Sequence, residues 1–467
     1  MRNKYDTYAS WGFDESPFQP APLTSDERGE RLFVGRETEL RDVKIDLHNK
    51  GKITCVEGAI GVGKTSLINV AAYQCYAEYV NREAVQLLIP CLEPFQLSAN
   101  ERVDAFVTNV YMTIAQTLIL RAREIKNLGY DLNGLSAVDA WLNEPVLEEV
   151  EKSIGIKAIV TAHVETSTAI NQGKGFSSVG IEKRVKDWLA KIFPNDSGGV
   201  VCIIDNLELL RTSAGARAQL DGLRDKLFNV KGMRWVLCGA NGIISSVLSF
   251  PRLAGFLNLP VHSINTVGKD FTSQFLQTRI KEFADDPARA YLPLGEPELT
   301  TLFWATNFNI RDLMTYADQF CKEIFKSGSF PKTPEERDKR FTQWLDKHTL
   351  DVFKQLSSDV GTRAWEVLDT AMCDKLKGTF YPSQYEFFRA AHMEILSKEV
   401  FDVSIKILEK FGLICGSISP KNGGGKSEVF FTVTSNGALV HYGRYLRKET
   451  RTLENAWLLR RSTGGYF

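Results

Sequence analysis

The chain has 467 residues, with 57 Lys+Arg against 57 Asp+Glu and 43 % hydrophobic residues. At roughly 100–200 residues per domain, this length predicts several domains with ample core. The composition excludes an intrinsically disordered chain, and the zero net charge argues against a protein that coats polyanions or membrane surfaces. We expect no membrane association, because no apolar run reaches the roughly 18 residues of a membrane span. We also expect no signal peptide, because no apolar stretch follows Met1.

The eight cysteines are scattered along the chain, without a Cys-x-x-Cys pair. Several lie inside apolar runs, where cysteine behaves as a small hydrophobic residue. This usage predicts a reducing, cytoplasmic location without structural disulfides or a cysteine-based zinc site.

The first predicted unit, residues 1–30, is an extended segment. Pro17, Pro20 and Pro22 exclude a helix where they occur, and the aromatic residues Trp11, Phe13 and Phe18 are expected to pin the segment down. From 31 to 265, short apolar runs alternate with helical patterns, which is typical of an α/β domain with a parallel sheet. We predict strands over 53–57, 84–90, 200–204, 234–239 and 260–265, and helices over 64–78 and 101–126. An insertion at about 130–180 is interpreted as a flap.

The C-terminal half is predicted to be mainly helical. Apolar residues at three- and four-residue spacing indicate a helical lid over 266–330, followed by a linker helix over 331–354. Helices over 361–376, 384–396 and 400–411, then strands over 413–419 and 429–434 around a glycine-rich tip, have the order of a winged helix. We assign that module to 355–445 and a basic tail to 446–467.

A glycine-rich loop after the first predicted strand carries the strongest motif. Residues 58–65 match G-x-x-x-x-G-K-[ST] without deviation. Backbone N–H groups of such a loop wrap around phosphate oxygens, and the following helix directs its positive end at the anion. Lys64 is expected to neutralise the β- and γ-phosphates of ATP, and the Thr65 hydroxyl to bind Mg²⁺. The expected nucleotide-binding residues of this loop are Gly58, Ala59, Ile60, Gly61, Val62, Gly63, Lys64, Thr65 and Ser66.

An apolar strand that ends in Asp205 supplies the second half of the predicted metal site. Asp205 is expected to hold Mg²⁺ together with Thr65. The next residue is Asn206, where many such ATPases carry the glutamate that activates water. Glu208 either takes over that role or faces solvent, and both interpretations stay open. Slow hydrolysis is therefore expected.

The sequence Phe33-Val34-Gly35-Arg36-Glu37-x-x-Leu40 precedes the loop. It resembles the box that precedes the phosphate loop in AAA+ and STAND ATPases, and the resemblance is closest to the replication-initiator, origin-recognition branch of AAA+. It implies a P-loop α/β core with a helical lid and a C-terminal winged helix. In that family the box lies against adenine, so Val34, Gly35 and Arg36 are expected to contact the base.

The same resemblance assigns three further positions. Asn241, after the fourth strand, matches the polar sensor that orients attacking water, although it is also a typical turn residue before glycine. Arg311 matches the lid arginine that contacts the γ-phosphate, and its alternative is a solvated helical arginine. Arg252 matches the finger that enters a neighbouring subunit's site, with an exposed loop arginine as the equally open alternative.

The winged-helix module offers a modest set of basic residues for DNA. The third helix would contact the major groove and the wing the backbone phosphates, with Lys406, Lys410, Lys421 and Lys426 as candidates. The tail over 444–461 has six basic and two acidic residues, which is less than a dedicated DNA-binding surface shows. The alternative is a module that contacts protein.

These observations predict an ATP-binding, slowly hydrolysing AAA+ switch that forms homo-oligomers with ATP and binds double-stranded DNA. The alternative is a STAND-type signalling or defence ATPase whose nucleotide state controls assembly with a partner effector protein. A third possibility, suggested by Asn206, is a nearly inactive nucleotide-binding scaffold.

Overall fold

The structure is a computed structural model. It describes residues 6–98, 100–132, 134, 138–139, 178–210, 213–244, 251–268, 271–356, 359–373, 375–391, 396–419 and 428–448. Nearly all of the predicted flap at about 130–180 lies outside the described residues. The same holds for the predicted wing tip with Lys421 and Lys426 and for the tail beyond residue 448.

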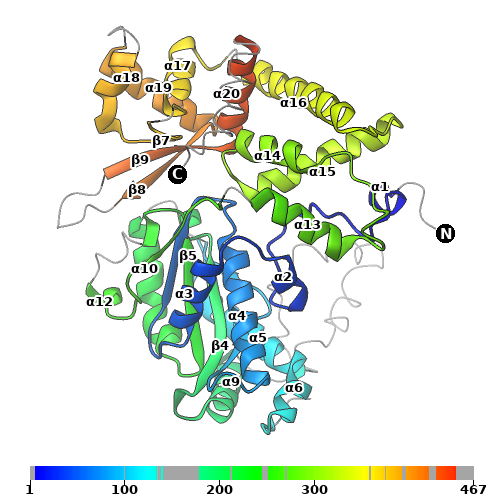
Figure 1. The fold of residues 1–467 in the computed structure, drawn as a ribbon. Coiled ribbons are helices and arrows are strands. Elements are labelled where there is room, and N and C mark those ends of the chain that lie inside the picture. The colour runs from blue at the N-terminus through cyan, green and yellow to red at the C-terminus, as the bar shows by residue number, and fades with distance from the viewer. Residues whose placement is uncertain are drawn as a thin grey trace, which may run out of the picture.

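A parallel sheet forms the centre of the N-terminal domain, as predicted (Figure 1). Its order is β2 (Leu87–Pro90), β4 (Gly198–Asp205), β5 (Met233–Gly239), β1 (Thr54–Gly58) and β6 (His262–Ile264). A short strand, β3 (Phe95–Gln96), pairs with the end of β4. All five predicted strands are present, with shifted ends. The strand order puts β5 between β1 and β4, so the loops that follow these three strands meet at one edge of the sheet.

Helices cover both faces of this sheet because its strands are apolar on both sides. Val201 and Ile203 pack toward α3 (Glu37–Leu47) and α4 (Lys64–Val80), whereas Val200 and Cys202 pack on the opposite face. The helices of that second face are α5 (Val103–Leu120), α9 (Ser178–Ile192) and α10 (Ser213–Leu223). The single helix predicted over 101–126 is divided at Arg121 into α5 and α6 (Ala122–Asn127).

Helix α5 is the one described helix that is long and apolar enough to cross a membrane. Its buried residues, including Phe106 and Tyr111, belong to the core of the sheet domain. Its apolar character therefore has a structural explanation within this domain.

A helical layer lies above the sheet domain in Figure 1. It comprises α13 (Phe271–Phe283), α14 (Glu296–Ala305), α15 (Ile310–Ser327) and α16 (Pro334–Leu356). The N-terminal segment packs into this layer through Tyr8, Trp11, Phe13 and Phe18, which share one hydrophobic core with the lid helices. The predicted linker helix, α16, contributes Phe341, Trp344 and Leu345 to the same core.

Two short helices occur within the segment predicted to be extended. They are α1 (Thr7–Ser10) and the beginning of α2 (Glu27–Leu32). Residues 11–26, all of them described, contain no helix, as their three prolines require.

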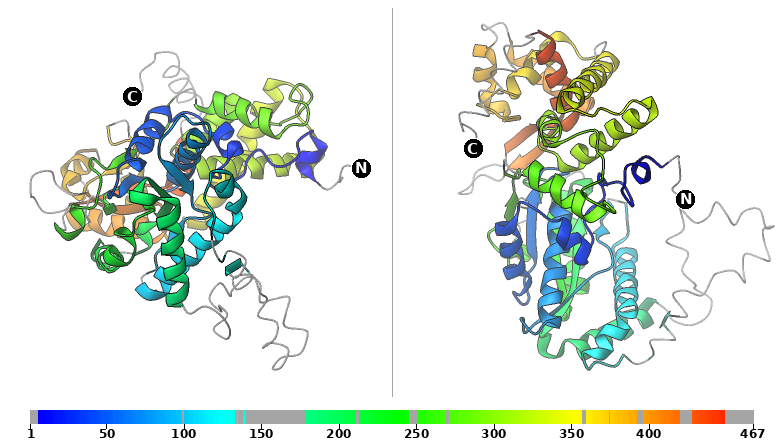
Figure 2. Two further views of the ribbon diagram at one scale, coloured as in Figure 1. Left: turned by 90° about the horizontal axis from the view of Figure 1, so that it is seen from below. Right: turned by 45° about the vertical axis from the view of Figure 1, so that its right-hand side comes forward.

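The C-terminal module has the three helices and antiparallel sheet of a winged helix. The helices are α17 (Thr362–Ala371), α18 (Tyr385–Ala391) and α19 (Lys398–Lys410), and the sheet order is β7 (Thr379–Phe380), β9 (Glu428–Val433) and β8 (Ile414–Ser419). A final helix, α20 (Ser435–Lys448), packs along α16. The right-hand view of Figure 2 shows the module beside the lid and above the sheet domain. The predicted fold class is thus confirmed.

Candidate functional site

The predicted phosphate loop connects β1 to α4 and closes around the ammonium group of Lys64. Gly61 and Gly63 have φ values of 78° and 98°, in the left-handed region that favours glycine. Lys64 is 6 % exposed, and its Nζ donates hydrogen bonds of 3.0 Å to the carbonyl oxygens of Gly58 and Ala59. The loop therefore holds a buried positive charge at the N-terminus of α4, an arrangement suited to an anion.

The predicted metal-binding residues are in direct contact. The Thr65 hydroxyl donates a 2.6 Å hydrogen bond to Oδ2 of Asp205, and both residues are buried. Oδ1 of Asp205 accepts the Asn206 N–H at 2.8 Å. A hydroxyl and a carboxylate oxygen beside a phosphate-binding loop fit the hard-oxygen preference of Mg²⁺, so the donor set matches that ion.

Glu208 is part of the same site and does not face away from it. Its Oε2 accepts a 3.0 Å hydrogen bond from the N–H of Ala240, the residue after β5. This contact joins the loops after β4 and β5. Burial raises the pKa of the Cys238 thiol well above its usual value, so this neighbour of Asp205 adds no negative charge.

One cavity joins the phosphate loop, the end of β4, the lid and the N-terminal segment. It is partly open to solvent. Arg311 lines it from α15, and its contact with the γ-phosphate stays a prediction. Its wall is formed by Pro20, Ala21, Pro22, Ile60, Gly61, Gly63, Lys64, Thr65, Ser66, Asp205, Asn206, Glu208, Ile310, Arg311 and Met314.

Two other predicted residues do not belong to the described cavity wall. Asn241 follows β5 and is half-buried. The side chain of Arg252 is 69 % exposed and lies 3.7 Å from Asp221, so within this chain it is a surface arginine. Their roles as sensor and finger stay predictions.

The predicted base-binding residues Val34, Gly35 and Arg36 are also absent from the described cavity wall. The Arg36 side chain is 3 % exposed, and its guanidinium donates to the carbonyl oxygens of Val62 at 3.0 Å and Asn265 at 2.6 Å. Burial lowers the pKa of Arg36, against the effect of Glu39. These contacts tie the phosphate loop to the end of β6. Base contact by the three residues stays a prediction.

Sequence reasoning missed the part that residues 14–25, here named the strap, play in the site. The Leu23 N–H donates to the Ser66 hydroxyl at 3.0 Å, and Nδ2 of Asn69 donates to the Leu23 carbonyl at 2.8 Å. These bonds fix the strap to α4 while Pro20, Ala21 and Pro22 line the cavity. The aromatic residues and prolines indicated an anchored segment but not where it docks.

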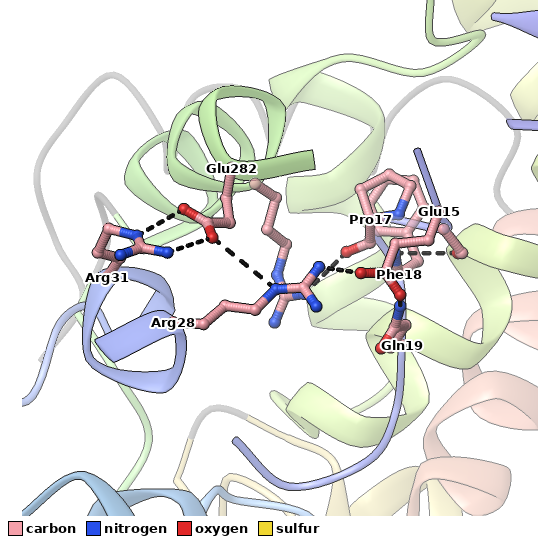
Figure 3. Close-up of polar contacts among 9 residues, drawn as sticks. Glu15, Pro17, Phe18, Gln19, Arg28, Arg31 and Glu282 are labelled. Carbon is pink, nitrogen blue, oxygen red and sulfur yellow. Dashed lines mark hydrogen bonds and ion pairs between the residues drawn. The ribbon is translucent and has the colours of Figure 1, made fainter. Parts of the chain in front are cut away.

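The strap is also fixed to the lid. Arg279, which is buried on α13, donates a 2.8 Å hydrogen bond to the Pro17 carbonyl, and burial lowers its pKa to about 10. Figure 3 shows Arg28 and Arg31 directed toward Glu282, with Arg28 also reaching Glu15. Arg31 donates two 2.8 Å hydrogen bonds to Glu282 and thereby lowers the pKa of that carboxyl. The strap therefore bridges the lid and the sheet domain.

No family model and no curated protein matches this chain. The solved structures that resemble it include the ORC1 protein of Aeropyrum pernix in complex with DNA, at 14 % identity, with 89 % of this chain and 95 % of that chain covered and a TM-score of 0.40. The Walker-type ATPase of Pyrococcus abyssi matches at 14 % identity, with 91 % and 99 % covered and a TM-score of 0.44. Cdc6p from Pyrobaculum aerophilum matches at 13 % identity, with 92 % and 97 % covered and a TM-score of 0.38. Likenesses this distant assign no activity to this chain.

Proposed function

We propose that the protein is a cytoplasmic ATP-binding switch of AAA+ type that hydrolyses ATP slowly, self-assembles with ATP and binds DNA through its winged helix. The observation that supports this most strongly is the convergence on one cavity of Lys64, the Thr65–Asp205 pair, Glu208 and Arg311. These side chains come from the phosphate loop, the sheet edge and the lid. Lys64 and Arg311 supply positive charge, the Thr65–Asp205 pair supplies metal ligands, and Glu208 supplies a base.

Each group has a distinct task in this proposal. Lys64 and the loop N–H groups bind the phosphates, while Thr65 and Asp205 hold Mg²⁺, which supplies charge neutralisation when bound. Glu208 accepts the proton of the attacking water. Arg311 contacts the γ-phosphate from the lid, and Arg252 completes the site of a neighbouring copy.

The DNA contact is proposed for α19. Lys406 and Lys410 are exposed on this helix, but Glu399, Asp402 and Glu409 lie on it too. A single copy therefore has little excess positive charge to offer DNA phosphates. Assembly with ATP would place several copies on one duplex and raise the overall affinity by avidity.

The second candidate is a STAND-type switch that controls assembly with a partner effector protein. The observation that favours it is the composition of α19, where Val400 and Val403 are 39 % and 53 % exposed. On the same helix Lys398 is paired with Asp402 at 2.8 Å. An exposed apolar and charge-balanced helix face suits a protein partner better than a phosphate backbone.

ATP binding and turnover by the full chain test the proposal. We expect Mg²⁺-dependent turnover that Lys64→Ala abolishes together with ATP binding, while the exposed-site control Lys50→Ala retains both. Wild-type protein that binds no ATP would refute the proposal. ATP binding without any turnover would instead support the third possibility, a nearly inactive nucleotide-binding scaffold.

A further inference from the structure

Residues 307–309, here named the coupling turn, connect the phosphate loop to the winged-helix module. The turn joins α14 to α15 and contacts both the phosphate loop and the winged-helix sheet. We infer that it transmits the occupancy of the phosphate loop to the winged helix, with Asn309 and Asn307 as the two positioning residues. This inference rests on the proposed nucleotide binding.

The first contact of the coupling turn is with the phosphate loop. Nδ2 of Asn309 donates to the Ile60 carbonyl at 3.1 Å, and the N–H groups of Ile310 and Arg311 donate to the Gly61 carbonyl at 3.1 and 3.3 Å. Oδ1 of Asn309 caps α15 by accepting the Asp312 N–H at 3.1 Å. Arg311 thus enters the cavity from a helix whose N-terminus is fixed to the loop.

Asn309 lies so close to the phosphate loop that it restricts which residue can occupy position 61. A Cβ added to Gly61 would lie 2.1 Å from Oδ1 of Asn309. Glycine at position 61 therefore serves two purposes. It leaves space for the Asn309 side chain, and it adopts the left-handed φ of 78°.

The second contact of the coupling turn is with the winged helix. Nδ2 of Asn307 donates a 2.8 Å hydrogen bond to the carbonyl of Val433, the last residue of β9. The Val433 N–H in turn donates to the Gly378 carbonyl at 2.7 Å. Asn307 therefore holds the point where the winged-helix sheet returns to α20.

The backbone between these contacts is constrained. Asn307 and Phe308 have φ values of 53° and 59°, and a left-handed aromatic residue is uncommon. The ring of Phe308 packs 5.3 Å from the rings of both Phe303 and Trp304, measured between centroids. Strained residues of this kind persist where their surroundings over-determine them, which is typical of switch regions. A shift at Asn309 consequently displaces Asn307, two residues away.

The peptide group provides the physical link to the nucleotide. In a trans peptide the C=O and N–H point in opposite directions. The Ile60 carbonyl accepts a hydrogen bond from Asn309, and the same peptide carries the N–H of Gly61 on its other side. A phosphate bound to that N–H polarises the peptide and strengthens its carbonyl as an acceptor. Phosphate binding and lid docking therefore favour each other, and this coupling is reciprocal.

The test makes two measurements on the full chain. One is its affinity for ATP, and the other is the hydrogen–deuterium exchange of residues 428–433 with and without ATP. The key variant is Asn307→Gly, because glycine keeps the left-handed backbone and removes only the amide. Asn307→Asp, which keeps the shape but lacks the donor, is the second variant. Asn229→Gly, at an exposed surface asparagine, is the control.

We expect ATP to slow exchange over 428–433 in the wild type and in Asn229→Gly. Both Asn307 variants should lose at least about two thirds of this difference while ATP affinity changes less than about threefold. Asn309→Ser retains a helix cap but cannot reach Ile60, so it should weaken ATP binding by about five- to tenfold, a typical coupling factor.

Unchanged exchange over 428–433 when ATP binds the wild type would overturn the inference alone. The inference would also be overturned if ATP still slowed exchange over 428–433 fully in both Asn307 variants. Wild-type protein that binds no ATP would instead refute the proposed function, and this inference with it.

Discussion

Glu208 is the residue on which the proposed chemistry depends most. In the proposed mechanism it takes the place of the carboxylate that Asn206 does not provide, and its hydrogen bond from the Ala240 N–H fixes one oxygen at the cavity wall. Asn206 itself has a left-handed φ of 55°, so the chain turns sharply after Asp205. That turn directs Glu208, two residues further on, back toward the site.

We predict that Glu208→Gln lowers kcat for ATP hydrolysis by about 10²–10⁴-fold, the usual contribution of a general base. The amide oxygen of the variant still accepts from Ala240, so ATP affinity should stay the same. Steady-state turnover and equilibrium ATP binding measure the two effects separately. An unchanged kcat would exclude Glu208 as the base.

Arg36 supports a second prediction at this scale. Its buried guanidinium bonds to the carbonyls of Val62 and Asn265, so we expect it to position the phosphate loop. Arg36→Met should lower the free energy of unfolding by about 1–3 kcal/mol because two buried acceptors lose a charged donor. Affinities for ATP and GTP should fall by similar factors. A loss confined to ATP would identify Arg36 as a base-binding residue.

At the scale of elements, the strap brings the lid and the sheet domain together. Its Phe18 lies in the lid core, its Pro20–Pro22 stretch lines the cavity, and the Leu23 backbone is hydrogen-bonded to α4. Neither domain is therefore complete without a segment that precedes both in sequence.

We predict that Phe18→Ala lowers the free energy of unfolding by about 3–5 kcal/mol, the usual cost of truncating a buried phenylalanine. Phe18 is 1 % exposed, whereas Leu120 is 68 % exposed and provides the control Leu120→Ala. Urea denaturation of both variants measures the effect. Equal stabilities would show that the strap does not belong to the lid core.

The elements also show which features the sequence determines locally. The phosphate loop and β4 were predictable, because glycine spacing and an unbroken apolar run ending in aspartate are contained in short segments. The docking of the strap was not, because the partner of Pro17 is Arg279, 262 positions away. The coupling turn was missed for the same reason, since Ile60 and Val433 lie 249 and 126 positions from the asparagines that they contact. The resemblance places the side chain of Arg36 against adenine, whereas its buried contacts are with the backbone carbonyls of Val62 and Asn265.

At the scale of the whole molecule, the neutral net charge conceals an uneven distribution. From residue 355 onward there are 15 basic and 12 acidic residues, so 42 and 45 remain upstream. The winged-helix part is thus slightly positive and the remainder slightly negative. Any DNA contact is therefore expected to be local and modest.

We predict that the double variant Lys406→Ala/Lys410→Ala binds duplex DNA more weakly and with a salt slope reduced by roughly 2, since each phosphate contact contributes about 0.9. ATP turnover should not change, because both residues lie outside the described cavity wall. Val400→Asp, which introduces a charge on the same helix, tests the alternative function, in which this helix binds an effector protein. A loss of effector binding without loss of DNA binding would favour the signalling switch.

The central claim is that bound nucleotide controls DNA binding. Fluorescence anisotropy of a labelled duplex, titrated with the full chain in ATP, ADP or no nucleotide at several salt concentrations, tests it most directly. We predict tight, salt-sensitive binding with ATP, weaker binding with ADP or no nucleotide, and loss of the ATP effect in Lys64→Ala. Affinities that are equally weak in all three nucleotide states would contradict the account.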